Sequence, residues 1–173
     1  MEASQARYRF GALSSITAEA IGEPGKRTFK LTLNAGAATA IVWLEKEQLS
    51  QLGSRLQEII GTLSDEEKSQ AGDAPEPEWN DRITNLDFKA AKLALGYDSG
   101  SGNFLLLAHN MEEEDDRTAT ISCWISLNQG EALGEEALRV CAAGRPQCPL
   151  CSRPIDPDGH MCPRANGHAP LQD

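Results

Sequence analysis

The stretch that decides the fold is Thr39-Ala40-Ile41-Val42-Trp43-Leu44, which leads directly into a segment with a different apolar period. Its β-branched and aromatic residues predict a strand. Apolar residues then recur at spacings of three and four, at Leu49, Leu52, Leu56, Ile59 and Ile60. One apolar stripe of this kind predicts an amphipathic helix from about Lys46 to Leu63. The chain therefore passes from a strand straight into a helix at this point.

The same junction occurs a second time, 81 positions further along the chain. The matching pairs are Trp43-Leu44 with Trp124-Ile125, Gln48 with Gln129, and Leu52-Gly53 with Leu133-Gly134. Extended segments precede each junction, at 8–13, 14–21 and 28–33 in the first half and at 83–97, 104–109 and 118–126 in the second. We interpret this as an internal duplication. The sequence predicts two β-β-β-α units that join their sheets around one core, an α+β fold.

The domain boundaries follow from changes in composition. We expect a first unit at 1–63, an acidic linker at 64–81, a second unit at 82–144 and a tail at 145–173. Pro75 and Pro77 exclude a helix, so the linker is expected to be solvated. In the second helix, Ser126 and Gln129 have the spacing of a capping box. Trp43 and Trp124 are expected to be core anchors where each sheet meets its helix.

The tail carries the most specific chemical signal in the chain. Cys148 and Cys151 form a Cys-x2-Cys turn, and His160 and Cys162 return to complete a tetrahedral set of ligands. His168 is the alternative to His160 as the fourth ligand. This spacing predicts a zinc knuckle, in the manner of a zinc ribbon. Because protein would fill all four positions, we expect a structural zinc and assign no catalytic role to it.

The overall charge limits the classes of partner. The 173-residue chain has a formal net charge of −10 and a pI near 4.8. Long-range repulsion therefore opposes general binding to nucleic acid or to anionic membranes. The polar segment Met1–Arg9 contains no signal-peptide core, and no apolar run is long enough to span a membrane. Together with the clustering of cysteines in the tail, this predicts a cytoplasmic protein without a disulfide framework.

Several runs resemble a known family. They are Gly22-Glu23-Pro24-Gly25-Lys26-Arg27-Thr28-Phe29, Leu44-Glu45-Lys46-Glu47-Gln48, Ala143-Gly144-Arg145-Pro146-Gln147-Cys148-Pro149-Leu150-Cys151 and Asp156-Pro157-Asp158-Gly159-His160-Met161-Cys162-Pro163-Arg164-Ala165-Asn166-Gly167. These runs are similar to the bacterial family catalogued as domain of unknown function 3090. The resemblance covers nearly the whole chain. Because that family has no assigned activity, the resemblance implies a family and leaves the function to the residues.

Three functions fit the sequence, in descending order. The first is a non-enzymatic binding or scaffold module for a protein partner, stabilised by zinc, with Arg27 and the junction Glu45, Lys46 and Glu47 as contact positions. The second is an enzyme or enzyme subunit in which Arg27 or Lys46 binds an anionic small molecule and Glu45 or Glu47 acts as general base. No nucleophile motif or phosphate-binding loop supports that reading. The third is nucleic-acid contact through the zinc tail, which acidity and the scarcity of aromatic residues oppose.

Overall fold

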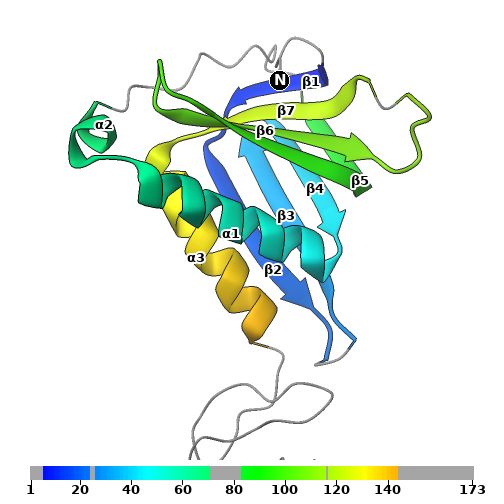
Figure 1. Ribbon diagram of the computed structural model, residues 1–173. Helices are drawn as coiled ribbons and strands as arrows, with labels where there is room; N and C mark the ends of the chain where they lie inside the picture. The colour runs from blue at the N-terminus through cyan, green and yellow to red at the C-terminus, as the bar shows by residue number, and fades with distance from the viewer. Residues whose placement is uncertain (1–5, 24–25, 71–82, 116, 144–173) are drawn as a thin grey trace, which may run out of the picture.

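The computed structural model describes residues 6–23, 26–70, 83–115 and 117–143, and Figure 1 shows their arrangement. The tail in which the sequence predicts a zinc knuckle lies outside these residues. The elements, in chain order, are β1 (Ala6–Ala12), β2 (Ser15–Ile21), β3 (Thr28–Ala35), β4 (Ala38–Leu44), α1 (Lys46–Thr62), α2 (Asp65–Ser69), β5 (Thr84–Asp98), β6 (Asn103–Asn110), β7 (Ala119–Ile125) and α3 (Leu127–Ala142). The α+β class predicted from the sequence is confirmed.

The strands form one seven-stranded sheet in the order β1-β7-β6-β5-β4-β3-β2. Strands β2, β3 and β4 pair antiparallel, and so do β5, β6 and β7. The two sets meet in the long strand β5. Its first part, residues 84–89, pairs parallel with β4, and its second part, from Ala90 onward, pairs antiparallel with β6. One strand therefore belongs to both halves of the sheet.

Strands β1 and β2 together pair with both halves of the sheet, as the single strand β5 does. Strand β1 pairs parallel with β7, and β2 pairs antiparallel with β3. Leu13 and Ser14 connect them: the Leu13 amide donates to the Trp124 carbonyl at 3.1 Å, and the Ser14 amide donates to the Asn34 carbonyl at 2.8 Å. The start of each half thus pairs with the last strand of the other half, which satisfies backbone groups that would otherwise lie on open edges.

Both bridging strands contain an irregularity in their pairing. The register shifts between Arg9 and Gly11 in β1, and between Ala90 and Lys92 in β5. Gly11 has a φ of 70°, a conformation that glycine adopts without steric cost and that bulges use to bend a strand. The shift in β5 lies where its pairing changes from β4 to β6, whereas the shift in β1 lies within its pairing with β7, before the chain changes partner at Ser14.

Helices α1 and α3 begin with the same capping hydrogen bond. The Oε1 atom of Gln48 accepts from the Glu45 amide at 2.8 Å, and that of Gln129 accepts from the Ser126 amide at 2.9 Å. Ser126 Oγ accepts in return from the Gln129 amide at 3.2 Å, so the capping box predicted there is confirmed. Gln48 also donates to the carbonyl of Ala90 in β5 at 3.3 Å, and Gln129 donates to that of Leu13, between β1 and β2, at 2.9 Å.

Helices α1 and α3 pack against each other on one side of the sheet (Figure 1). Both helices have a glycine at the contact, Gly53 in α1 and Gly134 in α3. A Cβ on Gly53 would lie 3.1 Å from the Cβ of Ala137, and a Cβ on Gly134 would lie 3.5 Å from the Cβ of Leu56. Because residues 53 and 134, like 56 and 137, are 81 positions apart, the contacts are reciprocal. The repeat in the sequence thus coincides with the helix crossing.

A single apolar cluster fills the space between the helices and the sheet. It takes residues from β1 through α3, and its largest fully buried members are Phe10, Leu31, Leu33, Val42, Leu49, Leu56, Phe104, Leu106, Ile121, Ile125 and Leu133. On β3 and β4, buried residues alternate with half-buried ones, as a strand with one face on the core requires.

Two expectations from the sequence are wrong. The segment that starts at Ser64 was expected to be free of helix, but α2 forms there, before the prolines: Ser64 Oγ accepts from the Glu67 amide at 3.1 Å, and Glu67 reaches back to the Ser64 amide. Neither Trp43 nor Trp124 anchors the main core, although Trp124 packs against a smaller buried cluster of Leu105, Leu107 and Ala119. Trp43 and Trp124 are half-buried, because alternation along β4 and β7 places both side chains on the sheet face away from the core.

Candidate functional site

The structure brings together two of the four residues that the sequence suggested as contact positions. Arg27 and Glu45 line the same cavity of about 320 Å³, together with Trp43, Lys89 and two neighbours, Thr28 and Leu44. We call this the Trp43 cavity. Lys46 and Glu47 do not line it: Glu47 is exposed in the first turn of α1, and Lys46 is half-buried, with its carbonyl 3.7 Å from the Cys141 thiol.

Strand pairing assembles the Trp43 cavity. On the outer face of the sheet, Trp43 is paired with Lys30 of β3 and with Lys89 of β5. The Lys30 ammonium lies 5.6 Å from the centre of the indole ring, within the range of a cation–π contact. The indole Nε1–H donates to Asp87 Oδ1 at 2.8 Å, which holds the orientation of the ring. Lys30 and Lys89 were not predicted as site residues, although alternation along their strands places both on the same face as Trp43.

The cationic groups around Trp43 differ in their pairing. Lys89 Nζ lies 2.6 Å from Glu45 Oε1, and Lys30 Nζ lies 3.7 Å from Glu19 Oε2. Lys89 and Glu45 are 48% and 66% exposed, so their ion pair adds little to stability. Arg27 is different: its Nε is buried and has no hydrogen-bond partner, and no carboxylate of the described residues pairs with it.

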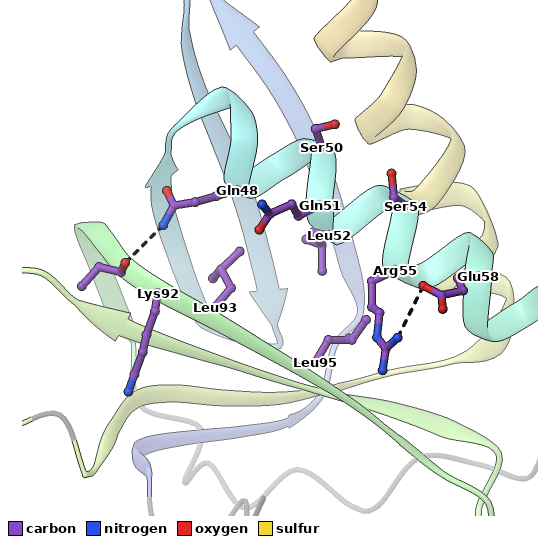
Figure 2. A pocket seen from close by; sticks show the side chains of 11 residues that line it. Gln48, Ser50, Gln51, Leu52, Ser54, Arg55, Glu58, Lys92, Leu93 and Leu95 are labelled. Atoms are coloured by element: carbon purple, nitrogen blue, oxygen red, sulfur yellow. Dashed lines mark hydrogen bonds and ion pairs between the residues drawn. The ribbon is translucent and has the colours of Figure 1, made fainter.

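A larger groove of about 650 Å³ lies between α1 and β5, and Figure 2 shows the side chains that line it. We call it the α1–β5 groove. Leu52, Leu93 and Leu95 give it apolar surface. The rest of the lining is mainly polar, with Gln48, Ser50, Gln51, Ser54, Arg55, Glu58, Ala91 and Lys92. In this groove Arg55 and Glu58 form an exposed ion pair at 3.4 Å, drawn as a dashed line in Figure 2.

The groove exists because the two helices pack differently on their bridging strands. Helix α3 lies closely along β2, whereas α1 contacts β5 less extensively. Gln48 holds the first turn of α1 to the bulge of β5, with its Nε2 3.3 Å from the carbonyls of both Ala90 and Ala91. Beyond this point the half-buried Leu93 and Leu95 are left at the floor of an open space (Figure 2).

The groups with shifted pKa values lie away from both cavities. Burial raises the pKa of the Cys123 thiol to about 12, and its Sγ donates to the Leu106 carbonyl at 3.7 Å. A thiol held neutral in this way is a poor nucleophile. The pKa of Asp98 is lowered, first by a hydrogen bond from Ser101 Oγ at 2.8 Å and then by one from the Gly100 amide at 3.3 Å. This carboxylate organises the β5–β6 turn.

The predicted zinc ligands Cys148, Cys151, His160 and Cys162, with the alternative His168, lie outside the described residues. Among the residues that are described, no three His, Cys, Asp or Glu side chains gather in a way that would hold a metal ion. His109, the histidine outside the tail, is half-buried in β6. In the same part of the chain, no helix is long and apolar enough to cross a membrane.

Comparison with known families matches residues 8–162 to the family described as "Protein of unknown function (DUF3090)". The chain belongs to this family. The match runs from β1 past α3 into the tail, so the resemblance seen in the sequence is confirmed over most of the chain. Searches of curated proteins and of solved structures found no match. For this DUF3090 member, function must therefore be argued from the site geometry.

Proposed function

We propose that the protein is a non-enzymatic binding module that docks a segment of a partner protein in the α1–β5 groove. The observation that carries the proposal is the groove itself. Its volume of about 650 Å³ lies within the range of cavities that bury ligands or side-chain clusters, and leucines form its floor. A rim of amides and hydroxyls around an apolar floor is typical of a recognition surface.

The charges of the groove suit binding better than catalysis. Its carboxylate, Glu58, is exposed and engaged by Arg55, so it is poorly placed to act as a general base. The amide of Gln48 caps α1 and holds β5, which is a structural role. The remaining polar groups include the hydroxyls of Ser50 and Ser54. These groups can position a partner through hydrogen bonds.

The groove also indicates the chemistry of the partner segment. Arg55 and Lys92 outnumber Glu58, so the lining is locally cationic on a protein whose net charge is −10. Apolar side chains would cover Leu93 and Leu95, and an acidic residue would face the two cations. We therefore expect a short segment that combines leucine-like side chains with Asp or Glu.

A pair of substitutions at equivalent helix positions tests this proposal. Ser54→Trp places a bulky ring in the groove, whereas Glu135→Trp places the same ring at the position of α3 that is 81 residues further on. Both positions are exposed, so both variants should fold. We expect affinity capture from the native host to recover a partner with wild type and Glu135→Trp, and to lose it with Ser54→Trp. The same partner recovered equally by all three proteins would refute docking in the groove.

We further propose that a structural zinc, held by Cys148, Cys151, His160 and Cys162, organises the tail. The Cys-x2-Cys and His-x-Cys spacing supports this assignment. Structural zinc in small peptides contributes about 10–16 kcal/mol of apparent binding free energy, enough to order a segment that has little core of its own.

A further inference from the structure

We propose that the Trp43 cavity is a second, separate binding site, which takes a small ligand with a carboxylate or phosphate group attached to a planar apolar group. Its lining shares no residue with that of the α1–β5 groove, and the inference does not rest on the proposed partner protein.

Arg27 is a donor without an acceptor. Its Nε is buried without a hydrogen-bond partner, and no carboxylate of the described residues pairs with the guanidinium, so the terminal N–H groups are left for an acceptor in the cavity. A guanidinium presents its N–H groups as a planar fork that matches the two oxygens of a carboxylate or phosphate. Because Arg27 lines the cavity, an oxyanion bound there is a suitable acceptor.

The charge balance of the cavity favours an anion over a cation. Its charged lining residues are Arg27, Lys89 and Glu45. Glu45 is already engaged by Lys89 at 2.6 Å, which leaves the positive charge of Arg27 uncompensated within the lining. A cationic ligand would meet that charge directly. An anion would meet Arg27 first and would compete with Glu45 for Lys89.

Trp43 accounts for the apolar part of the ligand. Since the indole N–H is engaged by Asp87 at 2.8 Å, the ring offers the cavity mainly apolar and π surface. Planar groups stack on such a surface. A volume of about 320 Å³ limits the ligand to roughly the size of one ring with its charged group.

The test measures binding of three anions, namely inorganic phosphate, phenyl phosphate and phenylacetate, with benzyl alcohol as the neutral control. The readout is the indole N–H signal of Trp43 in a ¹H–¹⁵N spectrum, identified by its loss in Trp43→Phe. We expect saturable shifts with phenyl phosphate or phenylacetate, weaker binding of inorganic phosphate, and none of benzyl alcohol. The tighter of the two aromatic anions identifies the head group.

Four variants make the test specific. Arg27→Gln should weaken binding about tenfold or more, since a charge-assisted pair is lost. Glu45→Gln should strengthen it about two- to fivefold, because Lys89 is released from an exposed pair. Arg55→Gln, which removes a cation from the groove, should leave binding unchanged. If circular dichroism shows that Arg27→Gln is unfolded, Lys89→Gln replaces it, with weaker binding expected.

The proposal is overturned by any of three results. The first is the absence of any shift of the Trp43 signal with the three anions up to about 10 mM, a concentration that would detect even a millimolar site. The second is wild-type affinity in the variant that lacks Arg27 or Lys89. The third is weaker binding in Glu45→Gln. The opposite signs expected for Arg27 and Glu45 distinguish a ligand site from a loss of fold, which would weaken binding in both.

Discussion

Individual glycines determine how closely the helices approach. A Cβ on Gly53 would lie 3.1 Å from both Ala137 Cβ and Leu138 Cγ, tighter than ordinary contact. A Cβ on Gly134 would lie 3.3 Å from Cγ of the flexible Gln57 side chain and 3.5 Å from its other neighbours. The two repeat-related glycines are therefore unequal, although both lie at the crossing of α1 and α3.

We predict that Gly53→Ala lowers the free energy of unfolding by about 1–2 kcal/mol, because overpacking outweighs the gain in helix propensity. Gly61→Ala serves as the control, since a Cβ there meets nothing within 4 Å. It should raise stability by up to about 1 kcal/mol. Urea unfolding of both variants provides the measurement, and a Gly53→Ala variant as stable as Gly61→Ala would contradict the tight crossing.

A second prediction at this scale concerns pH. Burial raises the pKa of Cys123 from 9.0 to about 12, so the folded state retains the thiol proton that the unfolded state releases. The contribution of this neutral thiol to stability is complete below pH 9 and is lost progressively as pH rises from 9 towards 12. We expect wild type to lose more stability than Cys123→Ala between pH 8 and pH 10, measured by urea unfolding. Equal losses would show that Cys123 does not titrate on unfolding.

Two glutamine side chains each cap the start of a helix and also hydrogen-bond to a backbone carbonyl in another segment. Gln129 accepts from the Ser126 amide at the start of α3 and donates to the Leu13 carbonyl between β1 and β2. Gln48 does the same for α1 and β5, with longer bonds to the strand. Each glutamine therefore ties the first turn of a helix to a segment of the sheet.

We predict that Gln129→Ala destabilises the protein by about 1–3 kcal/mol, because it leaves the Ser126 amide and the Leu13 carbonyl without their partner. Gln48→Ala should cost less, since its strand bonds are 3.3 Å long and one of them is exposed. Thermal unfolding of the two variants ranks them. A larger loss of stability in Gln48→Ala than in Gln129→Ala would contradict this prediction.

For the whole molecule, exchange of strands joins the two halves. Strand β1 pairs with β7 near the other end of the chain, and the start of β5 pairs with β4. Each half alone would therefore expose an edge that the other half covers. The cluster that fills the interior is shared between both halves in the same way.

We predict that residues 1–63 and 78–173, expressed separately, aggregate or remain poorly folded, because small chains bury too little apolar surface and here also lack strand partners. Co-expression of both fragments should restore a soluble complex with the circular dichroism of the intact protein. Two soluble halves that melt independently would contradict the exchange of strands.

The last prediction concerns the metal. Purified protein should contain one zinc per chain by elemental analysis, and Cys148→Ser or Cys151→Ser should release it. The core formed by residues 10–141 should remain folded, because the predicted ligands lie in another part of the chain. Leu171→Ser, a substitution in the tail away from the ligands, is the control. Unchanged zinc in both cysteine variants would rule out this ligand set.

The sequence by itself determined every element except α2, and their repetition. Local periodicity is a property of neighbouring residues, so the strand at 39–44, the stripe of α1 and the glutamine at position 129 could be read directly. Helix α2 escaped prediction because a proline constrains only the residues next to it, and α2 ends before Pro75 and Pro77.

Only the tertiary structure decided which strands pair and which faces are covered. The parallel pairs β4–β5 and β1–β7 join segments that no local pattern connects. The β4–β5 pair places Lys89 beside Trp43 and so completes the cavity that Arg27 and Glu45 also line. Of these three charged residues, only Arg27 and Glu45 could be selected from the sequence. The physical reason is that burial and strand partnership depend on the whole core, whereas periodicity depends on a few adjacent residues.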